Sequence, residues 1–184
     1  RVFAEIATAR PPKLLLIADG PRAGRLGEAD RVAEVRRIAT SIDWPCELLT
    51  NFSEVNLGCR RRVSTGLDWA FSQVEEAIVL EDDCLPDPTF FRFCDEMLEK
   101  YRDDTRIGMI AGSNFAFGHK RAENSYFYSR HVLIWGWAVS AGRPSRLSKV
   151  TCSTVRSSRW ATRSLISCAL VMMAGPAACW NVGS

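Results

Sequence analysis

Apolar positions along the first 114 residues follow two alternating patterns. Four segments repeat apolar residues every three or four positions, as amphipathic helices do: 1–9, 28–42, 60–77 and 88–101. Four others are short continuous apolar runs, which are typical of buried strands: 13–17, 46–52, 77–81 and 106–114. Because the two patterns alternate, the sequence predicts an α/β layered fold with a mostly parallel sheet.

The pattern changes in the last third of the chain. Residues 125–140 are rich in aromatic and β-branched side chains and have strand character. Beyond residue 139 no clear period continues, apart from a short helix predicted at Ser164–Ala174. All 21 acidic residues lie at or before Glu123, whereas residues 139–184 carry 6 Lys and Arg, no acid and 9 serines. We therefore expect a domain over 1–138 and an atypical tail over 139–184.

Three consecutive acids follow one of the predicted strands. Glu81, Asp82 and Asp83 come directly after the apolar run and repel one another. Asp19 and Asn56 follow two other predicted strands. Because ligands of open α/β sheets bind at the carboxyl ends of the strands, these residues predict a ligand site at one edge of the sheet.

Carboxylates in such a cluster suit Mg²⁺ or Mn²⁺, which prefer oxygen ligands and bridge to substrate phosphates. The alternative is that the acids are solvated or cap the next helix, where Asp87-Pro88 has the composition of a helix start. Three arginines, 60–62, open the third predicted helix and would either hold an anion there or form a solvated basic patch.

Composition narrows the class of protein. The chain is 47% apolar and 24% charged, which fits a globular domain, and it has no apolar stretch long enough for a membrane span. Seven cysteines without a CxxC pair argue against structural zinc and a disulfide framework, so we expect reduced thiols and a cytoplasmic location. The positive charge of residues 139–184 is the one feature that would suit nucleic acid, so we do not expect nucleic acid as a partner.

Five segments carry a resemblance to a known family: IADGPR, NFSEVNLGC, GLDWAFSQVEEAIVLEDDCLPDPTFFRFCDEMLEKY, IGMIAGSN and WGWA. In this order they resemble GT-A-fold nucleotide-sugar glycosyltransferases, most closely bacterial relatives of the N-acetylglucosaminyltransferase I family, over residues 1–138. LEDD followed by a proline-containing loop and two phenylalanines is the most specific part. The resemblance implies a three-layer sandwich and an inverting, metal-dependent transfer from a nucleotide-diphosphate sugar donor to the hydroxyl of a glycan or other acceptor.

The resemblance also implies roles for individual residues. It makes Asp83 the ligand of Mn²⁺ or Mg²⁺ and places the acceptor above Trp135, Gly136 and Trp137. It assigns donor binding to seven residues: Asp19, Gly20, Asn56, Gly58, Arg62, Glu81 and Asp82. The catalytic base is not identifiable, because His119 and His131 are more typical of a loop and a strand than of a base.

Two departures from the family pattern leave an alternative open. The family begins with a strand before the helix that here starts at Arg1, and it continues after WGWA with a segment unlike VSAGRPSRLSK. The loss of every acid in the tail indicates a reading-frame shift near Val139. The alternative function is therefore a truncated remnant that retains at most nucleotide or metal binding. Phosphoryl hydrolysis is disfavoured, because it would need further acidic ligands after Glu123.

Overall fold

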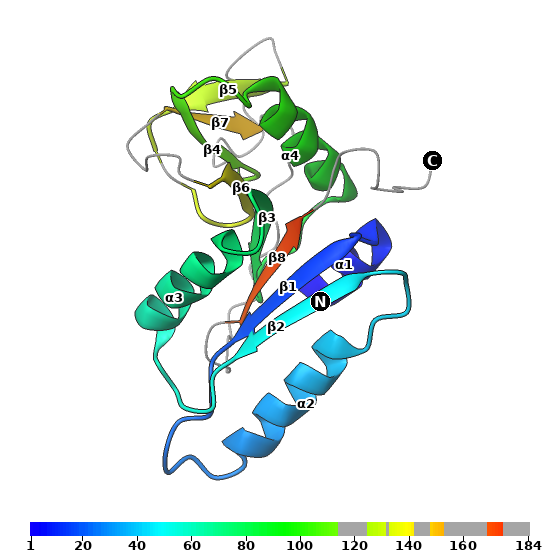
Figure 1. Ribbon diagram of the computed structural model, residues 1–184, viewed down its shortest axis with the longest axis vertical. Coiled ribbons are helices and arrows are strands. Elements are labelled where there is room, and N and C mark those ends of the chain that lie inside the picture. The colour runs from blue at the N-terminus through cyan, green and yellow to red at the C-terminus, as the bar shows by residue number, and fades with distance from the viewer. Residues whose placement is uncertain (114–124, 132, 142–147, 153–168, 175–184) are drawn as a thin grey trace.

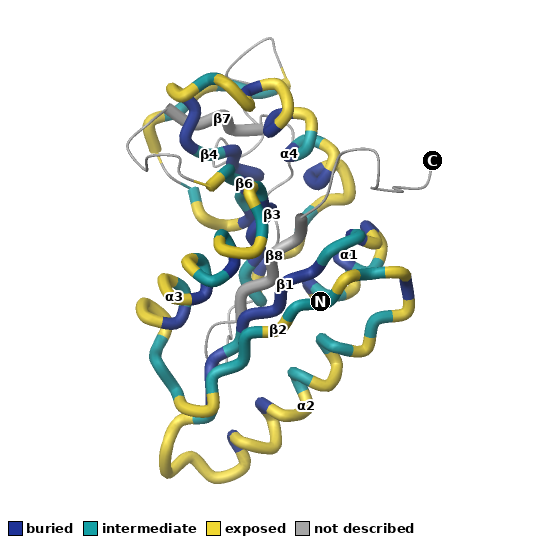
Figure 2. The backbone as a smooth tube through the Cα atoms, in the orientation of Figure 1, coloured by how far each residue is buried: buried dark blue, intermediate teal, exposed yellow. Residues whose placement is uncertain are grey.

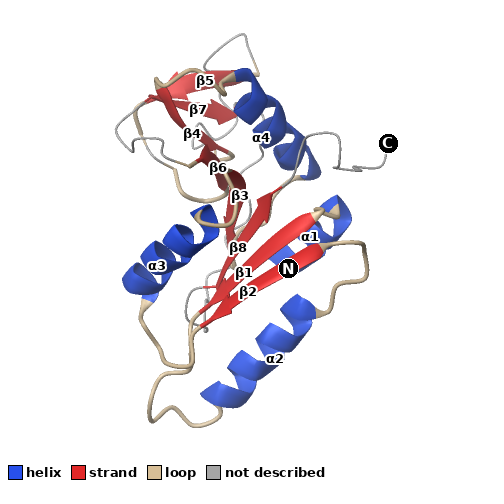
Figure 3. Ribbon diagram, in the orientation of Figure 1, coloured by secondary structure: helices blue, strands red, loops and turns tan. Residues whose placement is uncertain are grey.

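The computed structural model describes residues 1–113, 125–131, 133–141, 148–152 and 169–174 (Figure 1). This part of the chain forms four α-helices: α1 Val2–Ala9, α2 Glu28–Thr40, α3 Cys59–Phe71 and α4 Pro88–Lys100. It also forms eight strands: β1 Lys13–Ala18, β2 Glu47–Phe52, β3 Glu76–Glu81, β4 Ile107–Ala111, β5 Tyr126–Ser129, β6 Trp137–Ser140, β7 Ser148–Cys152 and β8 Ala169–Ala174. The predicted α/β class is confirmed, with every predicted helix and strand of the first 113 residues present (Figure 3).

The eight strands form one mixed sheet in the order β2-β1-β8-β3-β6-β4-β7-β5. Among the described strands, only the pairs β1–β2 and β4–β7 are parallel. The prediction of a mostly parallel sheet is therefore wrong. The reason is that β8 and β6 each insert, antiparallel, between strands that run in one common direction: β8 between β1 and β3, and β6 between β3 and β4.

The helices cover both faces of the sheet because β1 and β3 alternate their apolar side chains. Leu14, Leu16, Ile78 and Leu80 join the larger core cluster, which includes apolar residues of α1 and α4. Their neighbours Leu15, Ile17, Ala77 and Val79 form a second cluster with Ala70 of α3. Both strands are consequently buried on both sides, whereas α2 exposes most of its length (Figure 2). The layers are helices, sheet and helices.

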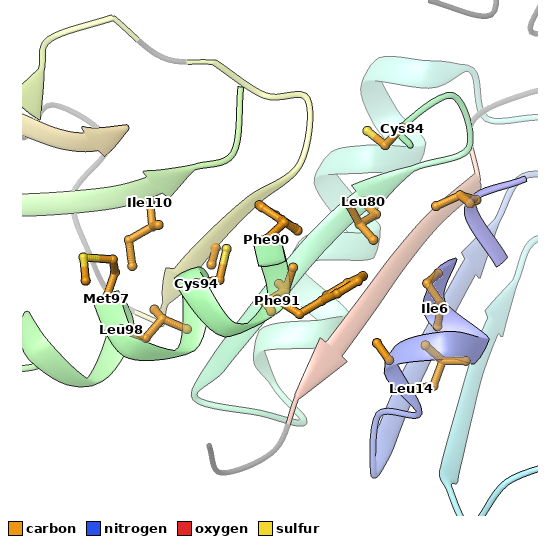
Figure 4. Close-up of a cluster of buried hydrophobic side chains, with 14 of the residues drawn as sticks. Ile6, Leu14, Leu80, Cys84, Phe90, Phe91, Cys94, Met97, Leu98 and Ile110 are labelled. Atoms are coloured by element: carbon orange, nitrogen blue, oxygen red, sulfur yellow. The ribbon is translucent and has the colours of Figure 1, made fainter. Parts of the chain in front are cut away.

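Helix α4 is placed by its first turn. The Asp87 side chain accepts a hydrogen bond from the Thr89 amide at 2.9 Å, and Pro88 occupies the first helical position, as the sequence predicts. Phe90 and Phe91 then enter the larger core cluster and are 2% and 1% exposed (Figure 4). Burial of each ring contributes about 2 kcal/mol or more, so the start of α4 is fixed close to the end of β3.

The tail departs from its prediction in one element. Residues 169–174 form strand β8 and not the end of a helix, because the run ALVMMA pairs with β1 on one side and β3 on the other. The remainder of the predicted helix, 164–168, lies outside the described residues, as does His119. Strand β6 crosses the predicted domain boundary at residue 138. The division of the chain at that point and the frame shift stay predictions.

Candidate ligand site at the carboxyl edge of the sheet

The strand register brings the predicted site residues to one edge of the sheet. Ala18, the last residue of β1, pairs with Ala169, and Glu81, the last residue of β3, pairs with Leu170. The ends of β1 and β3 therefore flank the start of β8 and lie about 10 Å apart, two strand spacings. Asp19 and the three acids after β3 extend from this edge, as the sequence predicts.

Asp19 joins the end of β1 to the loop that follows β2. Its side chain is 2% exposed. One carboxylate oxygen accepts hydrogen bonds from the amides of Gly20 (3.0 Å) and Leu57 (2.8 Å), and the other accepts one from Gly58 (2.9 Å). Gly58 is the N-cap of α3 and has no capping side chain. Asp19 therefore supplies the negative charge that a helix N-terminus favours, from a different element of the fold.

The loop after β2, residues 53–58, lies directly on Gly20. A Cβ atom at Gly20 would lie 2.6 to 2.7 Å from the backbone of Glu54 and Val55, so only glycine fits at this position. The Asn56 amide nitrogen donates to the Gly20 carbonyl at 3.0 Å. The predicted donor-side residues Asp19, Gly20, Asn56 and Gly58 are thus brought into one contiguous structure.

Arg62, in the first turn of α3, is buried, at 4% exposure. Its Nη2 donates to the backbone carbonyl and the side-chain oxygen of Asn51, at 2.5 and 2.6 Å. Burial lowers the pKa of Arg62, an effect that Asp19 opposes and Arg36 reinforces. The side chain therefore links β2 to α3, and within the described residues its buried Nε has no hydrogen-bond partner.

Arg36 of α2 is a member of this site that the sequence interpretation missed. Its Nη2 donates to the carbonyls of Asp19 (3.1 Å) and Ser53 (2.6 Å), and its guanidinium lies 4.9 Å from the centre of the Phe52 ring. In the sequence it is one of several polar residues on an amphipathic helix, and no spacing marks it. Only the close approach of α2 to the strand ends reveals the contact.

The three acids after β3 differ in exposure. Glu81 and Asp82 are half-buried and Asp83 is exposed. Burial raises the pKa of Glu81, and the negative charges of Asp83 and Asp82 raise it further. A cation placed among these carboxylates would reverse the last two effects. The turn closes through the Cys84 amide, which donates to the Glu81 carbonyl at 3.1 Å.

Within the described residues, no group of three or more His, Cys, Asp or Glu side chains is arranged to hold a metal ion by itself. The exposed carboxylate of Asp83 nevertheless suits Mn²⁺ or Mg²⁺, which commonly bind through one or two carboxylates and take their other ligands from water and phosphate oxygens. Asp83 would therefore supply one ligand to such a metal, and water and a phosphorylated ligand would supply the others.

The predicted acceptor-side segment lies beside the end of β3. The Gly136 carbonyl accepts from the Gly112 amide at 2.9 Å, and the Trp135 carbonyl accepts from the Ser113 hydroxyl at 2.6 Å. Gly136 has φ +73°, a conformation that favours glycine. Trp135 is 36% exposed, whereas Trp137 packs against the core cluster on the α3 face. Trp135 is thus the member of this segment that a ligand would reach.

A shallow hollow of about 470 Å³ lies over the first turns of α3. It is lined by residues 57–61 with Ser64 and Thr65, and the side chains of Arg60 and Arg61 are exposed there. Arg62, by contrast, is buried and bonded to Asn51, so the three consecutive arginines do not form one group.

Comparison with known proteins adds no relative. No protein-family model matches the chain, and no curated protein is significantly similar to it.

Proposed function

We propose that the chain is a nucleotide-sugar glycosyltransferase by descent, with its donor site at the carboxyl edge of β1, β2 and β3. The observation that carries the proposal is the placement of Glu81, Asp82 and Asp83 at the same sheet edge as the Asp19 loop. The resemblance of residues 1–138 to GT-A-fold enzymes supports it. On this proposal the carboxylates serve the donor and its metal, while the segment at Trp135 serves the acceptor.

The chemistry follows from the charge on the leaving group. Transfer of a sugar from a nucleoside diphosphate leaves negative charge on the terminal phosphate, which Mn²⁺ or Mg²⁺ would stabilise when bound. Asp83 would hold the metal, because it is the exposed acid of the three. Glu81 and Asp82 would accept hydrogen bonds from donor hydroxyls. The acceptor hydroxyl would attack directly, with inversion, after losing its proton to a base that the described residues do not reveal.

Binding experiments test the proposal before activity does. Calorimetric titration of the 184-residue chain with nucleoside diphosphates, with and without Mn²⁺, should show binding that depends on the metal. A sugar-transfer assay with several nucleotide sugars should then show turnover. Absence of both binding and transfer would contradict the proposal.

A non-catalytic remnant is the second candidate. The observation that favours it is the Asp19 carboxylate, whose two oxygens are already engaged by three backbone amides. Metal-dependent nucleotide binding without any transfer would support this candidate.

Two observations concern membrane-spanning helices and the state of the cysteines. Among the residues with described positions, no helix is long and apolar enough to cross a membrane. Within the same part of the chain, Cys46, Cys59 and Cys84 are free thiols. The cytoplasmic location stays a prediction.

A further inference from the structure

We propose that Arg36 is a positioning residue for the donor site: it holds the loop 53–58 closed over Asp19 and Gly20. This inference rests on the proposed function for its consequence in ligand binding. Its structural part, the closure of the loop, is measurable without any ligand.

One nitrogen of Arg36 joins two chain segments that are otherwise far apart in the sequence. Nη2 carries two hydrogens, and it donates to the Asp19 carbonyl at the end of β1 and to the Ser53 carbonyl at the end of β2. The planar guanidinium lies 4.9 Å from the centre of the Phe52 ring, which restricts its orientation. The contact is therefore a bridge across the two strand ends and not a surface ion pair.

The bridge fixes the groups on both segments. The Asp19 carbonyl and carboxylate belong to one residue, so holding the carbonyl also holds the carboxylate that accepts from Leu57 and Gly58. On the other side, Ser53 begins the loop that ends at these two amides. A ligand that meets a loop already ordered does not lose affinity to the ordering of that loop.

Arginine is suited to this role for two reasons. It donates to the two carbonyls as a charged group, and its planar guanidinium presents paired donors while stacking on a ring. Glutamine at this position would lose the charge and the stacking, and its shorter side chain would not reach both carbonyls.

The neighbouring Arg37 offers a matched control. It lies on the same helix, carries the same side chain and pairs with Glu34 on the exposed surface, with N···O distances of 2.7 Å. Arg37→Gln therefore removes a guanidinium from α2 without touching the loop. Arg36→Lys is the second variant, because it keeps a cation beside Phe52 and tests the bridge alone.

The first measurement is hydrogen exchange at the amides of Leu57 and Gly58, with the β1 amides that pair with β2 as the internal reference. Arg36→Gln should speed exchange at these two amides about tenfold or more, the effect of losing a hydrogen bond to a charged group. Arg36→Lys should give a smaller increase, and Arg37→Gln none. Equal exchange in the Arg36→Gln and Arg37→Gln variants would overturn the proposal.

The second measurement is the Kd for a nucleoside diphosphate with Mn²⁺, taken where all variants are fully folded by circular dichroism. Arg36→Gln should raise this Kd about tenfold, whereas Arg37→Gln should leave it unchanged. Faster exchange with an unchanged Kd would make Arg36 a purely structural contact and overturn its positioning role. If the unmodified chain binds no nucleoside diphosphate, the proposed function and the positioning role both fail, while the exchange data still decide whether Arg36 closes the loop.

Discussion

Replacement of Asp19 by asparagine tests the structural centre of the proposed site. Asparagine has nearly the same shape, and its oxygen would still accept from Gly20 and Leu57. Its NH₂ group would face the Gly58 amide, so one hydrogen bond is lost and two donors are placed together. A hydrogen bond to a charged group contributes roughly 1.5–3 kcal/mol, and the buried Arg62 also loses a nearby negative charge. We expect Asp19→Asn to reduce the free energy of unfolding by about 3 kcal/mol.

Urea unfolding followed by tryptophan fluorescence measures this loss. If the unfolding free energy falls by about 2 kcal/mol per M of urea, the urea concentration at the unfolding midpoint should fall by about 1.5 M. Asp103→Asn is the control, because Asp103 is an exposed carboxylate in the turn after α4 and its loss should change stability by less than about 0.5 kcal/mol. The comparison requires that the unfolding free energy of both variants depends on urea concentration as steeply as that of the unmodified chain.

The reasoning would be refuted by a loss below about 1 kcal/mol, or by equal losses in the two variants. Either result would mean that the carboxylate is not held by the three amides in solution. If Asp19→Asn loses stability as expected, the structural role of the carboxylate stands, whether or not an added nucleotide restores that stability.

Two further substitutions test a carboxylate on α4 and the contact between Gly20 and the loop 53–58. Burial is the main cause that raises the pKa of Asp95 to about 6, and the negative charges of Glu76, Glu96 and Glu99 add to it. Between about pH 4 and 6 the folded chain therefore keeps a proton on Asp95 that the unfolded chain releases. Stability should therefore fall as pH rises through this window, and Asp95→Asn should stabilise by about 1 kcal/mol at pH 8 after discounting for solvent screening, and hardly at all at pH 4. Equal gains at both pH values in urea unfolding would contradict this. Gly20→Ala should destabilise by about 2 kcal/mol, because its Cβ would meet the loop backbone; an unchanged melting temperature would show that the loop is not closed in solution.

The elements of the first 113 residues could be predicted because their signals are local. The apolar run before Glu81 and the Asp87-Pro88 helix start each specify their element from within a few residues. Strand β8 could not be recognised in this way, because ALVMMA takes its conformation from β1 and β3 on either side. A short apolar run is compatible with either helix or strand, and tertiary pairing decides between them.

The sequence predicts that the candidate site lies at one edge of the sheet, but it does not predict the hydrogen bonds that connect the site residues. The positions of Asp19 and the three acids follow from strand ends alone. That the Asp19 carboxylate accepts from amides at the start of α3, and that Arg36 reaches the same loop, depends on distances between elements separated by many residues. The sequence pattern contains no signal for either contact.

The most direct test of the donor-site proposal is calorimetric titration of the unmodified chain and of Asp83→Ala with a nucleoside diphosphate, each with and without Mn²⁺. Asp83 is exposed, so its replacement should leave the fold intact, which circular dichroism would verify. We predict that Mn²⁺ strengthens nucleotide binding to the unmodified chain and that this dependence disappears in Asp83→Ala. The same Mn²⁺ dependence in both proteins, or no nucleotide binding to either, would contradict the account.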